Sequence, residues 1–477
     1  MHRYLLPMML IAVPFAGLAA DATPERGPLR LTLKRAIEIA LSPEGNTYIQ
    51  LSDENVKMAK YKSEEAGSVF LPDIEAQAGR SSYMKSLSAL GLDLASDQAL
   101  QGAINSCPSA FVCSIEKPVL NSIIQYIPRV VGPFESVDVR ATATQSVFNF
   151  ANIRRYQASR TSVKAAKDDR LNTDQQVMSG VAKAYLAAQR SNADVEAGQA
   201  NVDLAEAVQK QAESQKEAGT GTGLDITRSK VQLSDARQHL LVAKNQRAKS
   251  YLQLLRAMGM DQATELELTD KLSFQPTGAI TVEQARAEAL KTRVDYKAEL
   301  AREKAAGQNA SAVKFERLPY MVAFADYGTT GADSSIVSLL PTRDYGFALR
   351  VPIFDGGRRD IRRAEAASQF RQERTRANDL REQIELDIRT ALDSLHSAED
   401  QLKVADEGMT LAESELTQTR RRFAAGFASS LEVADSQTKM ERARDNRISA
   451  LFNYNVARLD LGQAMGNVQR MIPVEKE

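Results

Sequence analysis

Residues 384–423, IELDIRTALDSLHSAEDQLKVADEGMTLAESELTQTRRRF, decide the fold because they carry an unbroken heptad repeat. Apolar or small residues recur at alternating steps of four and three, a period of about 3.5 residues. The positions are Ile384, Ile388, Ala391, Leu395, Ala398, Leu402, Ala405, Met409, Ala412, Leu416, Thr419 and Phe423. This period predicts long helices that supercoil side by side, with small residues allowing close approach and large residues filling the gaps.

A weaker copy of this stripe lies 207 residues earlier in the chain. Its positions are Val177, Val181, Ala184, Ala188, Ser191, Val195, Gly198, Val202, Ala205, Gln209, Ala212 and Lys216. Both copies continue through a turn that contains glycine, at 218–223 in the first and at 425–430 in the second. We therefore predict two long helical hairpins, 152–258 and 358–465, related by internal duplication.

Two pairs of predicted strands precede the hairpins, at 71–83 and 137–148 and again at 320–329 and 344–354. In the first strand Ile74 and Ala76 alternate with Asp73 and Glu75, which predicts one dry face and one wet face. Asp138 and Arg140 alternate with apolar neighbours in the same way. An insertion at 84–135 joins the first pair. The order helix, helix, strand, strand, hairpin thus occurs twice, in repeats at 31–260 and 280–467.

The composition favours a helical assembly over an enzyme. Lys+Arg and Asp+Glu are equal at 61 each, so no basic excess points to nucleic acid. Aromatic residues make up only 6% of the chain, and Trp is absent. The three histidines are isolated, and no Cys/His cluster or nucleophile–base pair stands out. We expect no catalytic residues, no metal site, no cofactor and no enzyme activity.

Residues 1–20 have the features of an export signal, with Arg3 before the apolar run Leu5 to Phe15 and predicted cleavage after Ala20 or Ala22. No later segment approaches the roughly 18 consecutive apolar residues of a membrane-spanning helix. Export would place Cys107 and Cys113 in an oxidising compartment, which favours a disulfide between them. Two free thiols in a loop are the alternative.

Several short motifs occur in a fixed order along the chain. They are Leu31-Thr32-Leu33, Leu71-Pro72, Leu318-Pro319, Val351-Pro352-Ile353-Phe354-Asp355-Gly356-Gly357-Arg358, Arg422-Phe423-Ala424-Ala425-Gly426 and Leu431-Glu432-Val433. Together with the duplicated hairpins, this series resembles the TolC-like outer membrane efflux proteins, also called outer membrane factors. The resemblance covers about 31–467, nearly the whole mature chain.

The resemblance implies a mainly α fold with a small β part. Four strands per chain would combine in a trimer, forming a twelve-stranded outer-membrane β-barrel on a periplasmic α-helical tunnel. The implied function is the exit duct of a tripartite efflux pump or a type I secretion system, for passive export of small molecules or polypeptide. The implied partners are a periplasmic adaptor (membrane fusion) protein, an inner-membrane pump of RND, ABC or MFS type, and outer membrane lipid. The insertion at 84–135 would then be extracellular.

The same resemblance implies a gate at the periplasmic hairpin turns. Glu432 and Asp435 are three residues apart and share a helix face, so three copies would form an acidic ring that favours cations. The alternative is that acidic residues in a first helical turn only complement the helix dipole.

The first turn carries Asp225, which in the family can pair with an arginine on the second turn. Ala428 occupies the matching position here, so this pairing lacks its partner. Gly219 and Gly426 would give the turns backbone freedom and contact the adaptor.

Two other classes of protein carry long coiled coils. A periplasmic adaptor would have one hairpin flanked by two lipoyl-like halves, whereas this sequence predicts two hairpins with paired strands. A structural coiled-coil protein would give the strands no membrane role. The duplicated order of elements favours the export duct over both.

Overall fold

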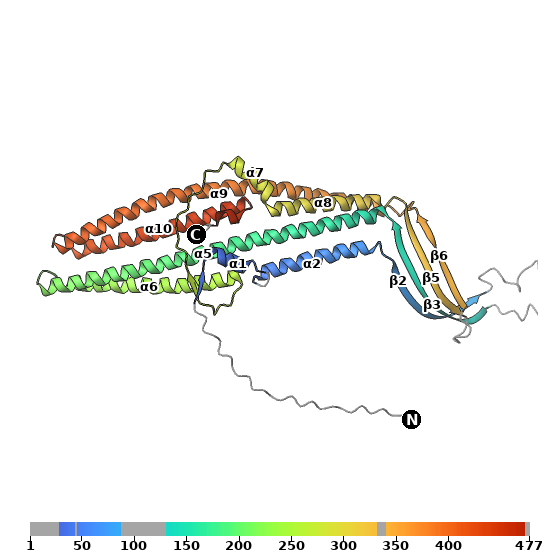
Figure 1. Ribbon diagram of the computed structural model, residues 1–477, viewed down its shortest axis with the longest axis horizontal. Helices are drawn as coiled ribbons and strands as arrows, with labels where there is room; N and C mark the ends of the chain where they lie inside the picture. The colour runs from blue at the N-terminus through green and yellow to red at the C-terminus, as the bar shows by residue number, and fades with distance from the viewer. Residues whose placement is uncertain (1–27, 43–44, 87–129, 332–339, 473–477) are drawn as a thin grey trace, which may run out of the picture. The chain divides into compact units, whose positions relative to one another are not determined.

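The computed structural model describes residues 28–42, 45–86, 130–331 and 340–472. The predicted export signal, Cys107, Cys113 and residues 87–129 of the predicted insertion lie outside these ranges. In chain order the elements are β1 Leu29–Leu31, α1 Leu33–Ala40, α2 Thr47–Ser68, β2 Asp73–Ser86, β3 Val130–Phe148, α5 Phe150–Glu217, α6 Gly223–Met258, β4 Leu266–Leu268, α7 Val282–Thr292, α8 Val294–Phe315, β5 Tyr320–Gly331, β6 Leu340–Arg350, α9 Arg358–Ala424, α10 Ser430–Ala464 and the 3₁₀ helix η3 Val468–Met471 (Figure 1).

The chain forms two compact units. One comprises residues 1–50, 173–292 and 386–477, and the other comprises 51–172 and 293–385, so α5 and α9 contribute to both. Among the described helices, none is long and apolar enough to cross a membrane. The predicted mainly helical fold with four strands in one sheet is confirmed.

The second unit contains an antiparallel sheet of order β2-β3-β5-β6 (Figure 1). Directly opposite residues in an antiparallel sheet share a face. The register aligns Ile74, Ala143, Ala325 and Tyr345 across the four strands, so one face is apolar.

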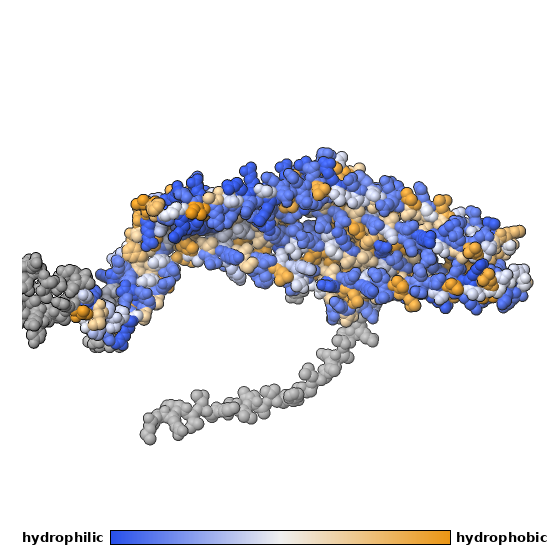
Figure 2. Space-filling model, turned by 180° about the vertical axis from the view of Figure 1, so that it is seen from behind, coloured by the Kyte–Doolittle hydropathy of each residue, from blue (hydrophilic) through white to orange (hydrophobic). Residues whose placement is uncertain are grey.

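The opposite face of this sheet is polar. Glu75, Thr142, Asp326 and Asp344 are aligned there by the same register. The Arg140 guanidinium on this face pairs with Asp138 at 2.8 Å and with Asp326 at 3.3 Å. Hydrophobic colour in Figure 2 gathers over part of the sheet and at the helix ends that adjoin it.

Several strand boundaries differ from the predicted ones, by the largest amounts at the end of β2, the start of β3 and both ends of β6. β2 continues to Ser86, and β3 begins at Val130 rather than at residue 137, because Ser86 and Val130 pair in the ladder. Both ends of the predicted insertion therefore belong to strands. β6 covers Leu340–Arg350 and does not reach residue 354. The proline at 352 has no N–H to donate to a ladder, which explains the early end.

A β-bulge changes the face of the last residue of β3. Ser146 lies opposite Val322, but Phe148 lies opposite Met321, so the register shifts by one residue between them. Because Met321 is opposite Leu349 on the apolar face, the bulge brings Phe148 to that face as well. Strict alternation would have placed Phe148 with Ser146 on the polar face.

The heptad stripe of α9 is the buried side of the second hairpin. Every position of the predicted stripe from Ile384 to Phe423 is buried or half-buried. The positions of the first copy, along α5, are also buried or half-buried, except for Lys216, which is exposed beside the turn.

Helix α5 also has a second, partly buried stripe, which the sequence did not indicate. This stripe faces α10, where Arg190 bonds Ser449 at 3.0 Å, Asn201 bonds Arg444 at 2.8 Å, and Leu204 packs beside Met440.

The core of the first unit gathers around the short parallel pair β1 and β4, which was not predicted from the sequence. The Tyr185 hydroxyl is buried there, and its single proton is shared between two acceptors, the Leu31 carbonyl oxygen and an Asp270 carboxylate oxygen, each 2.9 Å from the hydroxyl oxygen. Burial and the neighbouring Asp270 carboxylate raise the pKa of Tyr185, so it remains a neutral donor.

Candidate functional site

The two hairpin turns end their first helices with the same backbone motif. Gly219 and Gly426 have φ angles of 77° and 82°, in the left-handed region that favours glycine. Thr220 N bonds Gln215 O at 2.9 Å, and Phe427 N bonds Arg422 O at 2.8 Å. With the bonds from the glycine nitrogens, these form a Schellman motif at the end of α5 and another at the end of α9.

The helices after the turns begin with capping boxes that use the predicted acidic residues. The Asp225 carboxylate accepts from Thr222 N at 3.1 Å, and the Glu432 carboxylate accepts from Ser429 N at 3.0 Å. The Thr222 and Ser429 hydroxyls in turn accept from Asp225 N and Glu432 N, each at 3.3 Å. The hydrogen bond from Ser429 N is the main cause that lowers the pKa of Glu432.

Asp225 also joins the first turn to the second. Its other carboxylate oxygen accepts a hydrogen bond from the hydroxyl of Ser430, and this bond is the main cause that lowers the pKa of Asp225. Near the two turns, Val208, Phe423 and Val433 form a buried apolar cluster, and Ala428 packs against this cluster. Thus the turns are in contact even though Ala428 replaces an arginine.

Ser430 was not predicted as the partner of Asp225, because the matching position for a charged partner is residue 428. The available signal was two consecutive serines at 429 and 430, where the first caps the helix and the second is free to reach across.

Asp435 and Glu432 each lie near a cation. Lys439 bonds Asp435 and Glu415, both at 2.9 Å, and so links α10 to α9. These two hydrogen bonds raise the pKa of Lys439, with the bond to Glu415 as the larger cause. Arg422 lies 3.7 Å from Glu432. The two acidic residues therefore lie on one exposed helix face, partly balanced by Lys439 and Arg422.

Exposed apolar side chains occur at both turns, and the sequence analysis did not single them out. Leu224 and Leu431 occupy equivalent positions of the two copies and are 57% and 61% exposed. Phe427 at the second turn is 78% exposed. Over the described residues, no group of His, Cys, Asp and Glu is arranged to hold a metal ion.

Comparison with known proteins identifies the family. Residues 131–260 and 285–467 match the family described as "Outer membrane efflux protein". The pyoverdine export outer membrane protein OpmQ of Pseudomonas aeruginosa is 26% identical over 325 residues, which are 65% of each chain. OpmQ of Pseudomonas putida is 24% identical over 350 residues, 69% of this chain and 70% of the relative. The matched part is thus slightly under two thirds of the first relative's length.

Solved structures of outer membrane channels share the fold. VceC of Vibrio cholerae has a TM-score of 0.69 at 16% identity and covers 91% of this chain and 96% of its own. CusC has a TM-score of 0.72 at 15% identity and covers 98% and 99%. The open state of MtrE from Neisseria gonorrhoeae has a TM-score of 0.70 at 16% identity and covers 91% and 89%.

The solved structures confirm the predicted fold. The family match confirms the outer-membrane location and the non-enzymatic class that the sequence predicts. The family match alone covers well over half of the chain. The chain belongs to the outer membrane efflux protein family.

Proposed function

We propose that this protein is the outer-membrane exit channel of a tripartite export system for small molecules. The observation that carries the proposal is the pairing of two long hairpins with a sheet that is apolar on one face and polar on the other. The apolar face suits lipid, and the polar face suits a water-filled passage. Relatives named for pyoverdine export favour a small molecule over a polypeptide as the cargo.

A homotrimer is part of this proposal. In the described sheet β2 and β6 are the edge strands, and edge strands with free hydrogen-bonding groups tend to pair with another chain. Three four-stranded sheets joined edge to edge give a closed sheet of twelve strands.

The helical hairpins support the same assembly. Val404, Gly408 and Leu411 form a second heptad stripe on α9, and Val404 and Leu411 are 69% and 71% exposed. They line a groove of about 1090 Å³ with α10. The equivalent residues of α5, which include Asn201 and Leu204, pack on α10 within the chain.

In the internal repeat, α9 corresponds to α5, and α6 corresponds to α10. Because α5 packs on α10 within one chain, the exposed stripe of α9 packs on α6 of the neighbouring subunit. Gly408 would then lie near Arg237 of that subunit, as Asn201 lies near Arg444 within one chain. Cysteines at these two positions, with Cys107 and Cys113 changed to serine, should cross-link subunits into a trimer ladder on a denaturing gel. Either cysteine alone should leave monomers, and a double variant that stays monomeric after oxidation would contradict this interface.

The hairpin turns form the gate in this proposal. The bond from Ser430 to Asp225 and the cluster of Val208, Phe423 and Val433 hold the turns of one subunit together. Glu432 and Asp435, repeated by threefold symmetry, form the acidic ring. The nearby cations Arg422 and Lys439 moderate the repulsion between these carboxylates.

The turns also form the docking surface for a periplasmic adaptor, which connects the channel to an inner-membrane pump of RND, ABC or MFS type. Leu224, Phe427 and Leu431 are exposed beside Gly219 and Gly426 and offer an apolar surface to a partner's helices.

Two measurements test the proposed function. The purified protein in planar bilayers should give discrete single-channel currents, and detergent-solubilised protein should run as a trimer. In a host without its own efflux channel, expression with the matching pump and adaptor should restore export, and Leu224→Glu with Leu431→Glu should abolish export while leaving the currents intact. A protein that stays monomeric and gives no currents would refute the proposal.

A further inference from the structure

A chain of aromatic rings leads from the apolar face of the sheet to an arginine at the start of α5. The bulge places Phe148 on that face, and its ring centroid lies 4.4 Å from that of Phe150. Phe150 lies 6.1 Å from Phe315, and the Arg154 guanidinium lies 5.8 Å from the centre of the Phe315 ring. The apolar surface therefore ends at a cation.

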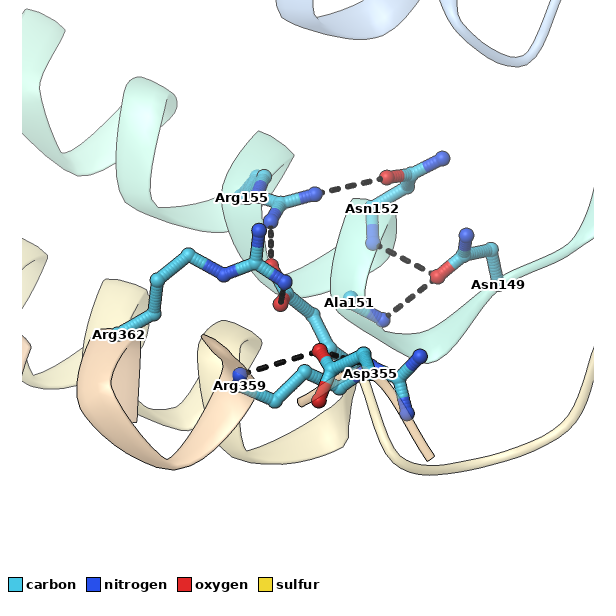
Figure 3. A network of polar contacts seen from close by, with 8 residues as sticks. Asn149, Ala151, Asn152, Arg155, Asp355, Arg359 and Arg362 are labelled. Atoms are coloured by element: carbon cyan, nitrogen blue, oxygen red, sulfur yellow. Dashed lines mark hydrogen bonds and ion pairs between the residues drawn. The ribbon is translucent and has the colours of Figure 1, made fainter. Parts of the chain in front are cut away.

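Two more arginines adjoin this end and share one carboxylate. Arg155 from α5 and Arg362 from α9 both donate to Glu316, the latter at 2.7 Å (Figure 3). The Glu316 side chain is 13% exposed, whereas both arginine side chains are 46% exposed. Across the described residues, Arg154 has no carboxylate within ion-pair distance and bonds only to Gln157. Three guanidiniums and one carboxylate leave a local charge of 3 − 1 = +2, in a chain whose formal net charge is +0.

Exposed apolar residues also occur along the segment that leads from β6 to Arg362 in α9. Leu349, at the end of the apolar face of β6, is 69% exposed, and Ile353 beyond it is 93% exposed. Ile361 in the first turns of α9 is 70% exposed. Apolar surface next to unneutralised guanidinium is typical of the boundary between hydrocarbon and headgroups.

We propose that Arg154, Arg155 and Arg362, called the arginine collar, bind the phosphate headgroups of anionic phospholipids. These lipids belong to the membrane leaflet that is nearer to the helices α5 and α9. This proposal rests on the proposed function, which puts the apolar face of the sheet in lipid. Guanidinium matches the geometry of a phosphate through paired N–H donors. The Arg155 side chain also bonds Asn152 at 3.4 Å, yet both arginine side chains remain 46% exposed beside their bonds to Glu316. The continuity from the apolar face to the collar favours lipid over a soluble anion as the ligand.

The absence of tryptophan from the chain permits a direct test. An Ile353→Trp variant of the full chain carries a single tryptophan, which bromine atoms on neighbouring lipid quench. It is reconstituted in phosphatidylethanolamine vesicles that contain either brominated phosphatidylethanolamine or brominated phosphatidylglycerol. We expect both lipids to quench, with phosphatidylglycerol bound about fivefold more strongly, because one basic group near an anionic headgroup contributes roughly 1 kcal/mol.

Arg154→Gln with Arg362→Gln, added to the Ile353→Trp variant, should lower the ratio of phosphatidylglycerol binding to phosphatidylethanolamine binding to about one. Arg155 still pairs with Glu316 in this variant. The matched control is Arg371→Gln with Arg374→Gln, two exposed arginines about three turns farther along α9, which should keep the preference.

The brominated phosphatidylethanolamine arm separates the possible failures. If it does not quench Ile353→Trp, the sheet is not in lipid and the proposed function fails as well. If it quenches but phosphatidylglycerol shows no preference, or if the collar variant keeps the preference, the arginine collar alone is refuted.

Discussion

At the scale of single residues, the turn after α6 has a position that admits only glycine. Gly259 has a φ of 74°, and a Cβ there would lie 1.6 Å from the carbonyl oxygen of Gly45. Gly259→Ala should therefore destabilise the protein by about 2 kcal/mol or more, seen as a lower Tm in circular dichroism. Gly180→Ala within α5 is the control, since nothing lies within 4 Å of its added Cβ and the position is exposed. It should be neutral or stabilise by about 0.5–1 kcal/mol. Equal melting of both variants would contradict the steric argument.

The contact between the turns should depend on pH through Asp225. A carboxyl group whose pKa is lowered by folding stabilises the fold above its unfolded pKa, and this contribution is lost as the pH falls through the folded pKa. The contact should thus be constant at neutral pH and weaken only below pH 3.8, the ordinary value for Asp225.

Hydrogen exchange at the amides of the second turn measures this dependence. Ser430→Ala should increase exchange at neutral pH and flatten the dependence, while Ser414→Ala on the exposed face of α9 should change neither. A wild-type turn whose exchange protection is the same on both sides of pH 3.8 would rule out this role for Asp225.

At the scale of elements, the sheet register assigns neighbouring residues of β3 to opposite environments. Ala141 lies opposite Ala76 and Tyr327 on the apolar face, whereas Thr142 lies opposite Glu75 and Asp326 on the polar face.

Ala141→Arg should cost about 2–4 kcal/mol of membrane stability and reduce the yield of assembled protein in the outer-membrane fraction. Thr142→Arg adds the same side chain next to carboxylates and should assemble normally. If both variants assemble equally well, the apolar face does not contact lipid.

At the scale of the whole molecule, conservative substitutions separate the local contacts of the acidic residues from their proposed role in an acidic ring. Gln can replace Glu in a capping box, so Glu432→Gln retains the cap and removes the charge. Together with Asp435→Asn, it should lower the cation selectivity of the channel, measured as a reversal potential in a salt gradient. Glu407→Gln with Glu413→Gln, which removes two exposed charges elsewhere on α9, should not. Unchanged selectivity in the first variant would refute the acidic ring and leave Glu432 with its capping bond and Asp435 with its ion pair to Lys439.

The sequence by itself determined the long helices, the four strands of the larger sheet and their order, but not the short pair of β1 and β4. The heptad stripe from Ile384 to Phe423 fixed the buried side of α9, and the alternation around Ile74 fixed the two faces of a strand, because these periods are local properties of helices and strands. The glycines at the turns and the acidic residues that follow them were likewise predicted, since they act within a few residues.

Only the tertiary structure decided which surfaces meet. The second stripe of α5 is partly buried because α10 packs on it, and the equivalent stripe of α9 is exposed within the chain, although both share the same spacing. The bulge that turns Phe148 to the apolar face, and the bond from Ser430 to Asp225, join residues that are distant in sequence. A local pattern specifies which side of an element is buried, whereas its partner depends on contacts between distant segments that no local period encodes.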